Sequence, residues 1–181
     1  MISMSRFTDS YFIINRRVEK VEKFIAVLII SLIVLIIFSA TVSRYLFNAS
    51  LFGAERISTY LMIWLGFLGF QIATSRMRHI EVGFITQKVN PRTRYILNFI
   101  SELVSSMICL IFSVLSISFL LQSLELGDKD IVLEIPIWII ILILPLSFFL
   151  SAVRFFISSF LWIDVLKGLR KEEEFVKKEF L

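Results

Sequence analysis

The stretch FIAVLIISLIVLIIFSATVS, residues 24–43, decides the fold of this chain because it contains no charged side chain. An α-helix of about 20 apolar residues is long enough to cross the roughly 30 Å hydrocarbon layer of a bilayer. Further runs of this kind follow along the 181-residue chain, at Ile57–Ser75, Leu103–Leu124 and Ile135–Val153. The sequence therefore predicts an all-α membrane protein with four transmembrane helices.

Boundary signals define the ends of these helices. Asn90-Pro91 is typical of an N-cap followed by proline at the first helical position, and Pro136 opens the fourth span in the same way. Gly127 is a stop signal after the third span, and Pro145 should kink or locally unwind the fourth. We predict a transmembrane domain over residues 24–163, with spans at about 24–43, 57–75, 96–124 and 136–162.

Composition and charge agree with this class. Hydrophobic residues make up 57% of the chain, more than the core of a soluble domain of this size can bury. The formal net charge of +4 does not indicate a nucleic-acid partner, because the basic residues flank the apolar spans. From the N-terminal segment to the tail, the segments outside the spans hold five, two, five, one and five Lys or Arg. By the positive-inside rule, both termini and the second loop should be cytoplasmic.

The segments flanking the spans are expected to be helical and polar. An apolar helical stripe runs through residues 1–23 into the first span and consists of Tyr11, Ile14, Val18, Val21 and Ile25. This stripe fits either an amphipathic helix in the cytoplasmic interface or an extension of the first span into water. Residues 80–89 fit a second amphipathic interfacial element, and residues 164–181 form a charged cytoplasmic tail.

Packing faces can be read from small and hydroxylated residues. Gly66, Gly69 and Ala73, together with Met62, share one face of the second span, where another helix can approach closely. The serines of the third span can bond either to their own helix or to a neighbour; they are Ser105, Ser106, Ser113, Ser116 and Ser118. Arg154 lies just past the fourth apolar run, where we expect it to snorkel to the headgroups.

The chain holds no recognisable catalytic set. His79 is the only histidine and Cys109 the only cysteine, which excludes a histidine metal cluster, a disulfide within the chain and a CxxC pair. Nucleotide-binding and hydrolase motifs are absent. Glu55 and Glu102 lie at span ends, whereas a self-sufficient proton-coupled carrier needs a carboxylate near mid-membrane. We predict that the chain is not an enzyme and holds no catalytic, substrate-binding or metal-ligating residue and no cofactor.

The first outer loop allows two interpretations. Residues 44–55 read RYLFNASLFGAE, with Arg44 at one end and Glu55 at the other. An ordinary interfacial loop with a snorkelling arginine and aromatic side chains explains this composition. A folded connector in which Arg44 pairs with Glu55 explains it as well.

An ordered series of short motifs resembles the small membrane subunit of TRAP transporters (tripartite ATP-independent periplasmic transporters), the DctQ-like family. The series is Arg44-Tyr45-x-Phe47-Asn48-x-Ser50-Leu51, then Glu55, then Trp64, Gly66 and Gly69, then Arg76 and Arg78-His79-Ile80-x-Val82, and finally Ile135-Pro136-x-Trp138 with Pro145. The sequence departs from the family pattern at Gly53 and Gly83, where the family has an aromatic residue and an aspartate.

The resemblance implies a three-part uptake system of bacteria or archaea in the cytoplasmic (inner) membrane. A periplasmic solute-binding protein captures an organic acid, such as sialic acid or a C4-dicarboxylate, and a large polytopic subunit moves it inward with Na⁺. The Na⁺ is expected in that large subunit and not in this chain. The small subunit scaffolds the large one within the membrane lipid and helps to dock the binding protein.

The residues that we expect at subunit interfaces or docking surfaces combine the motif series with the packing face. They are Arg44, Tyr45, Asn48, Ser50, Glu55, Trp64, Gly66, Gly69, Ala73, Arg76, His79, Pro136 and Trp138. Two other functions remain open at this point: a self-sufficient small oligomeric transporter and a membrane assembly factor.

Overall fold

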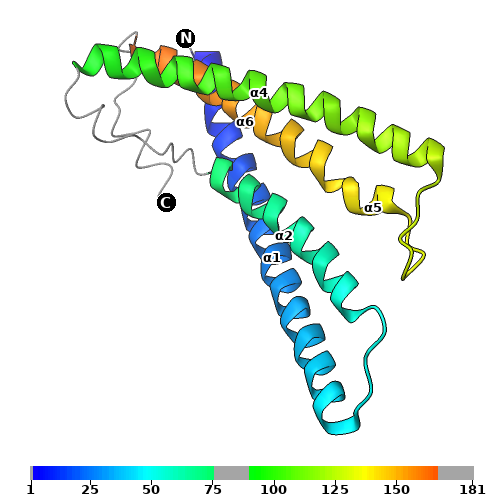
Figure 1. Cartoon of the computed structure of the whole chain (residues 1–181). Coiled ribbons are helices and arrows are strands. Elements are labelled where there is room, and N and C mark those ends of the chain that lie inside the picture. The colour runs from blue at the N-terminus through cyan, green and yellow to red at the C-terminus, as the bar shows by residue number, and fades with distance from the viewer. Residues whose placement is uncertain (1, 76–89, 167–181) are drawn as a thin grey trace.

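The computed structural model describes residues 2–75 and 90–166, without the side chains of residues 2–10, 12, 91–92 and 164–166. Arg76, His79, the element expected at residues 80–89 and most of the tail lie outside this range. The described residues form α1 (Ile2–Phe47), α2 (Ala54–Ser75), α4 (Pro91–Leu126), α5 (Ile137–Ile141) and α6 (Ile143–Leu166) (Figure 1). Among the described residues, four segments are long and apolar enough to cross a membrane: Ile13–Phe47, Ala54–Ser75, Thr93–Leu126 and Ile137–Ile163. The prediction of an all-α, multi-pass membrane protein is confirmed.

Helix α1 runs without a break through both the N-terminal segment and the first span. Its 46 residues contain no glycine or proline and extend for about 69 Å. The salt bridge between Glu19 and Lys23, one turn apart, supports the helix in the predicted interfacial segment. Residues 2–23 are therefore continuous with the first span. Whether they lie in the cytoplasmic interface or extend into water stays a prediction.

Helix α4 begins and ends at the predicted signals. Asn90 is the N-cap and Pro91 the first helical residue, although the Asn90 side chain makes no capping hydrogen bond. At the other end, Gly127 adopts the left-handed conformation (φ 64°), and its N–H donates to the carbonyl of Leu124. This local chemistry, independent of tertiary contacts, explains why the sequence located both ends.

The fourth span is interrupted at Leu142, one helical turn before Pro145. Helix α5 ends at Ile141, Leu142 lies between the helices, and α6 begins at Ile143. The ring of a proline clashes with the carbonyl four residues earlier, which here belongs to Ile141, and the missing N–H leaves that carbonyl without its helical donor. The predicted local unwinding is confirmed.

The helices form two hairpins, with α1 beside α2 and α4 beside α5 and α6 (Figure 1). We call the end with residues 48–53 and 127–136 the loop end, and the end where α2 stops and α4 begins the terminal end. One apolar cluster joins the hairpins; it consists of Ile29 and Ile33 of α1, Leu68 of α2 and Ile143 of α6. A second joins α4 to α6 at the terminal end, where Tyr95 stacks on Trp162 with ring centroids 6.0 Å apart.

Candidate functional site

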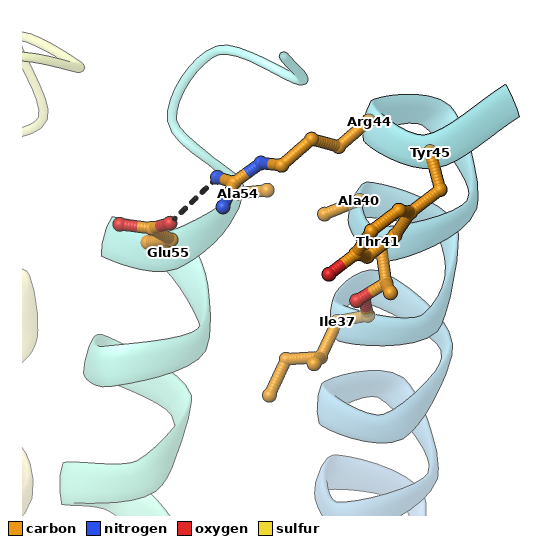
Figure 2. Close-up of a pocket in the computed structure, with 7 residues that line it drawn as sticks. All are labelled: Ile37, Ala40, Thr41, Arg44, Tyr45, Ala54 and Glu55. Carbon is orange, nitrogen blue, oxygen red and sulfur yellow. Dashed lines mark hydrogen bonds and ion pairs between the residues drawn. The ribbon is translucent and has the colours of Figure 1, made fainter. Parts of the chain in front are cut away.

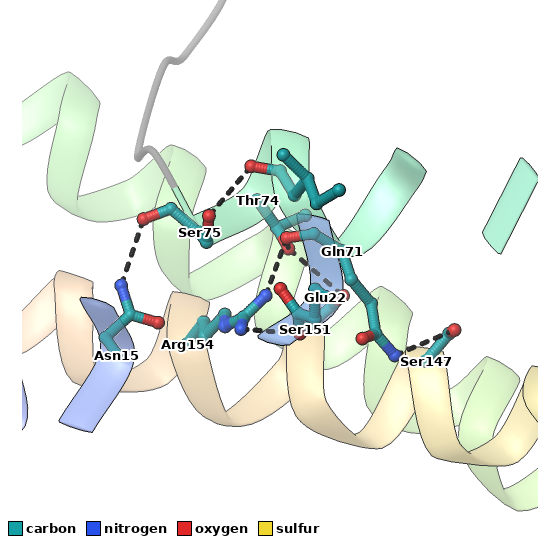
Figure 3. Close-up of polar contacts among 9 residues, drawn as sticks. Asn15, Glu22, Gln71, Thr74, Ser75, Ser147, Ser151 and Arg154 are labelled. Carbon is teal, nitrogen blue, oxygen red and sulfur yellow. Dashed lines mark hydrogen bonds and ion pairs between the residues drawn. The ribbon is translucent and has the colours of Figure 1, made fainter. Parts of the chain in front are cut away.

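A buried polar cluster joins α1, α2 and α6 near the terminal end (Figure 3). Arg154 is only 4% exposed; it donates to Oε1 of Glu22 (2.8 Å) and to the carbonyl of Gln71 (2.6 Å). The Gln71 side chain donates to Ser147 (2.9 Å), and the hydroxyls of Thr74 and Ser151 lie 3.3 Å apart. The polar cluster is thus Glu22, Gln71, Thr74, Ser147, Ser151 and Arg154.

The prediction that Arg154 snorkels to the headgroups is wrong. Glu22 is 5% exposed and supplies a counter-charge inside the bundle, so the guanidinium reaches its partners without leaving the protein. A charge in a low-dielectric interior is tolerated when it is paired and its hydrogen bonds are satisfied. Arg154 is therefore a structural ion-pair residue that holds α6 to α1 and α2.

The polar cluster also bonds to backbone carbonyls of α2. The Gln71 carbonyl accepts from Arg154 and from the Thr74 hydroxyl (2.9 Å), and the Ser75 carbonyl accepts from the Asn15 side chain (3.0 Å). A backbone carbonyl has two lone pairs, so it can accept such bonds in addition to a helical one. These contacts attach α2 to α6 and to α1.

The depth of the polar cluster follows from its position along α2. About 24 Å of helix separates Glu55, in the first turn of α2, from Gln71. If Glu55 lies at one edge of a roughly 30 Å hydrocarbon layer, Gln71 and Arg154 lie near the other edge. With that placement the buried charges are off-centre, and Arg154 and Glu22 are bonded to one another, an arrangement that suits a fixed joint better than a conduction path.

Hydroxyl groups connect α4 to α6. Glu102 is fully buried and accepts from the Ser158 hydroxyl (2.6 Å). Ser106 donates to the Ala152 carbonyl (3.0 Å) and Ser113 to the Pro145 carbonyl (3.5 Å). By contrast, Ser116 and Ser118 bond to carbonyls of their own helix, at Phe112 and Val114. Serines of the third span therefore bond both to their own helix and to a neighbouring helix, and both predicted hydrogen-bonding patterns are confirmed.

A second joint between the hairpins lies at the loop end. The Tyr60 hydroxyl of α2 donates to Oδ1 of Asp130, whose Oδ2 accepts from the backbone N–H groups of Val132 (3.0 Å) and Leu133 (2.8 Å). Beside it, Leu133 packs so closely on Gly53 that a Cβ at that position would meet the leucine side chain. One carboxylate thus folds the loop between α4 and α5 and attaches it to α2.

Two glycines with positive φ provide a matched test of this contact. Gly53 (φ +77°) faces Leu133, whereas a Cβ at Gly127 (φ +64°) would meet open space. Gly127→Ala should lower the free energy of unfolding by about 1 kcal/mol, the backbone cost of a left-handed alanine. Gly53→Ala should cost more than Gly127→Ala, because the leucine must also move. Unfolding in mixed detergent micelles measures both, and equal losses would show that Leu133 contributes nothing.

The cleft in Figure 2 lies between α1 and α2 at the loop end. Arg44 of α1 reaches across to Glu55 of α2, with Nη2 and Oε1 separated by 3.2 Å, and their side chains are 62% and 85% exposed. The folded-connector interpretation of this loop is therefore the one that the structure supports. The cleft has a volume of about 260 Å³ and is lined by Ile37, Ala40, Thr41, Arg44, Tyr45, Ala54 and Glu55.

The small-residue face of α2 is open. Apart from the adjacent backbone of α2 itself, neither Gly66 nor Gly69 has an atom within 4 Å of the position that a Cβ would take, and Ala73 is exposed. Within the described residues, this face therefore packs against no other helix. Trp64 is partly buried and packs against the apolar cluster that joins the hairpins, and its expected place at a subunit interface stays a prediction.

The other predicted interface residues surround the loop end. Tyr45 is 81% exposed, Ser50 lies exposed in the loop after α1, and Asn48 (φ 49°) makes the turn that ends α1. Pro136 is the residue before α5 and pairs in a short bridge with Lys129, while Trp138 is partly buried in α5. Arg76 and His79 lie outside the described residues.

The spacing of polar residues in the sequence indicates where the buried ionic residues lie. Asn15, Glu22 and Ile29 recur every seven residues in α1, so they share a face, and Ser147, Ser151, Arg154 and Ser158 do the same in α6 with spacings of four, three and four. A serine stripe that includes an arginine indicates a polar face turned toward protein, because lipid offers it no partners.

These features define the class of the protein: a multi-pass helical membrane protein whose buried polar groups join its own helices. Among the described residues, no group of three or more His, Cys, Asp or Glu side chains is placed to hold a metal ion. Cys109 is buried as a free thiol.

Comparison with known proteins names the family. The family model for the DctQ component of tripartite ATP-independent periplasmic transporters matches residues 33–164, most of the chain, and the chain belongs to this family. A protein of Haemophilus influenzae named as a TRAP transporter small permease protein is 33% identical over 92 residues. That alignment covers 51% of this chain and 57% of the relative. The resemblance stated from the motif series is thereby confirmed.

Proposed function

We propose that this chain is the scaffold subunit of a Na⁺-coupled TRAP transporter for organic acids of the sialic acid or C4-dicarboxylate class. It braces a large polytopic transport subunit in the inner membrane, with both termini in the cytoplasm, and helps to dock a periplasmic solute-binding protein. The Na⁺ and the solute are handled by the partners, and this chain needs no cofactor of its own.

The observation that carries this proposal is the contrast between a closed interior and an open face. Inside, Arg154 is bound by Glu22 and Gln71, and Glu102 by Ser158, so these polar groups hold helices together. Outside, the face of α2 at Gly66 and Gly69 lacks a partner helix among the described residues. Close approach of backbones at small residues drives helix association in lipid, which makes this face suitable for a helix of the large subunit.

The alternating loop charges support the proposed orientation, since they predict that the loop end faces the periplasm. The exposed Arg44, Tyr45 and Glu55 at that end are then accessible to the binding protein. Glu55 and Glu102 are the carboxylates that a self-sufficient transporter would use, and each is already bonded within the chain. This arrangement gives no specific support to that alternative.

Gly69→Leu tests the interface directly. Because a side chain at Gly69 points into open space, the variant should fold as the parent does, yet it should lose nearly all co-purification with the large subunit. Gly69→Ala, which adds one methyl group, serves as the matched control and should retain most of the complex. The measurement is the yield of the large subunit captured by the tagged chain in mild detergent.

Two outcomes separate the claims. If the parent chain captures no large polytopic protein, the scaffold function itself is wrong. If the parent captures it and Gly69→Leu does so equally well, only the assignment of the α2 face is wrong. Solute uptake by vesicles holding this chain alone would favour the self-sufficient transporter.

A further inference from the structure

The cleft between α1 and α2 combines opposite charges at its mouth with apolar walls below. Arg44 and Glu55 stand at the mouth, and Ile37, Ala40 and Ala54 line the space beneath them (Figure 2). The two alanines leave room between the helices that larger side chains would fill. Its volume of about 260 Å³ suits one extended hydrocarbon chain segment better than a bulky solute.

The cleft lies at the depth where lipid headgroups meet acyl chains. Arg44 is in the last turn of α1 and Glu55 in the first turn of α2, so both charges are at the end of their spans. Ile37 lies two turns deeper, about 10 Å along α1. The mouth is therefore at headgroup level and the floor reaches the hydrocarbon.

The ion pair at the mouth retains capacity for a ligand. It uses Nη2 of Arg44 and Oε1 of Glu55 at 3.2 Å, which is long for a charge-assisted hydrogen bond. A guanidinium has five N–H donors in total and a carboxylate has two acceptor oxygens. Exposed pairs of this kind contribute little stability, so a headgroup can join the pair or separate it at low cost.

We propose that this cleft binds one zwitterionic phospholipid with a primary ammonium headgroup, of the phosphatidylethanolamine type. Its phosphate binds Arg44, its ammonium donates to Glu55, and one acyl chain lies along Ile37, Ala40 and Thr41. A choline headgroup carries no N–H and cannot donate to Glu55, and a glycerol headgroup carries no cation. The site is a property of α1 and α2 and does not depend on the proposed transport function.

The test compares three lipids of identical acyl chains on the purified full-length chain: phosphatidylethanolamine, phosphatidylcholine and phosphatidylglycerol. Native mass spectrometry after delipidation and titration should show phosphatidylethanolamine binding about three- to fivefold more tightly, the effect expected of one exposed charge pair. Free O-phosphoethanolamine should not compete at equal concentration, because it lacks the acyl chain. Equal binding of the three lipids, preference for phosphatidylglycerol, or competition by O-phosphoethanolamine would overturn the proposal.

Variants locate the site. Arg44→Gln and Glu55→Gln should each weaken phosphatidylethanolamine binding about three- to fivefold, and Ala40→Phe should weaken it by filling the cleft while keeping both charges. Glu19→Gln and Lys23→Gln, which remove charges of an ion pair about 32 Å away along α1, are the matched controls and should have no effect. Arg44→Lys and Glu55→Asp should bind nearly as the parent does.

If the glutamine variants bind like the controls, the cleft is not the site. If a variant fails to fold, the lipid comparison on the parent chain decides.

Discussion

Replacing Arg154 by methionine should be among the most damaging single changes in this protein, with a loss of about 3–5 kcal/mol in free energy of unfolding. The change leaves the Glu22 carboxylate buried without its cation and removes a donor from the Gln71 carbonyl. Both groups lie where water cannot easily replace the lost partner. Equilibrium unfolding in mixed detergent micelles, followed by circular dichroism, measures the loss.

A double-mutant cycle separates the ion pair from the packing of the side chain. Adding Glu22→Leu to Arg154→Met removes the stranded charge, so the double variant should recover much of the loss. Lys23→Ala, which breaks the more exposed pair with Glu19, is the matched control and should cost less than about 1 kcal/mol. If Arg154→Met is no more damaging than Lys23→Ala, Arg154 does not hold the hairpins together.

Replacing Asp130 by alanine should detach the loop between α4 and α5 from α2. The change removes the acceptor of the Tyr60 hydroxyl and of two backbone N–H groups, at Val132 and Leu133. Hydrogen exchange at those two amides should accelerate about tenfold or more, as expected when a charge-assisted bond is lost.

Two controls resolve the contributions of the Asp130 carboxylate. Tyr60→Phe removes only the hydroxyl, so it should loosen the joint with α2 while Val132 and Leu133 stay protected. Asp128→Ala changes an exposed carboxylate of the same loop and should leave exchange unchanged. Unchanged exchange in Asp130→Ala would mean that the loop is held by other contacts.

The same joint should depend on pH in the acid range. The hydrogen bond from Tyr60, followed by the N–H groups of Leu133 and Val132, holds the pKa of Asp130 below its ordinary value. A lowered pKa in the folded state means that the carboxylate stabilises the fold fully well above the ordinary pKa of about 3.9. This contribution is lost as the pH falls below that value and through the lowered pKa. Asp130→Asn should remove this part of the pH dependence of stability, compared with the parent in the same titration.

The features that the sequence predicted well depend on local chemistry. The ends of α4 at Asn90-Pro91 and Gly127, and the interruption caused by Pro145, need only the residues around them. Arg44 and Glu55 are eleven positions apart across one short loop, so their ion pair could also be predicted from the sequence.

The features that the sequence did not reveal depend on contacts between distant parts of the chain. Arg154 bonds to Glu22 and Gln71, which lie 132 and 83 positions away along the chain. The serines on its face of α6 indicate contact with protein, but they do not indicate which residues Arg154 meets. The continuity of α1 through residues 2–23 also does not follow from the sequence, because an amphipathic stripe fits both a separate helix and a long one.

The two joints between the hairpins have a mechanical consequence. Tyr60 and Gln71, through which α2 is fastened at the loop end and at the terminal end, lie about 16 Å apart along the helix. Two hairpins joined at a single contact could rotate about that contact. Two contacts at separate positions along α2 prevent both rotation and sliding of one hairpin against the other. A force on one hairpin is therefore transmitted to the other, and we expect the two hairpins to move as one rigid body in the bilayer.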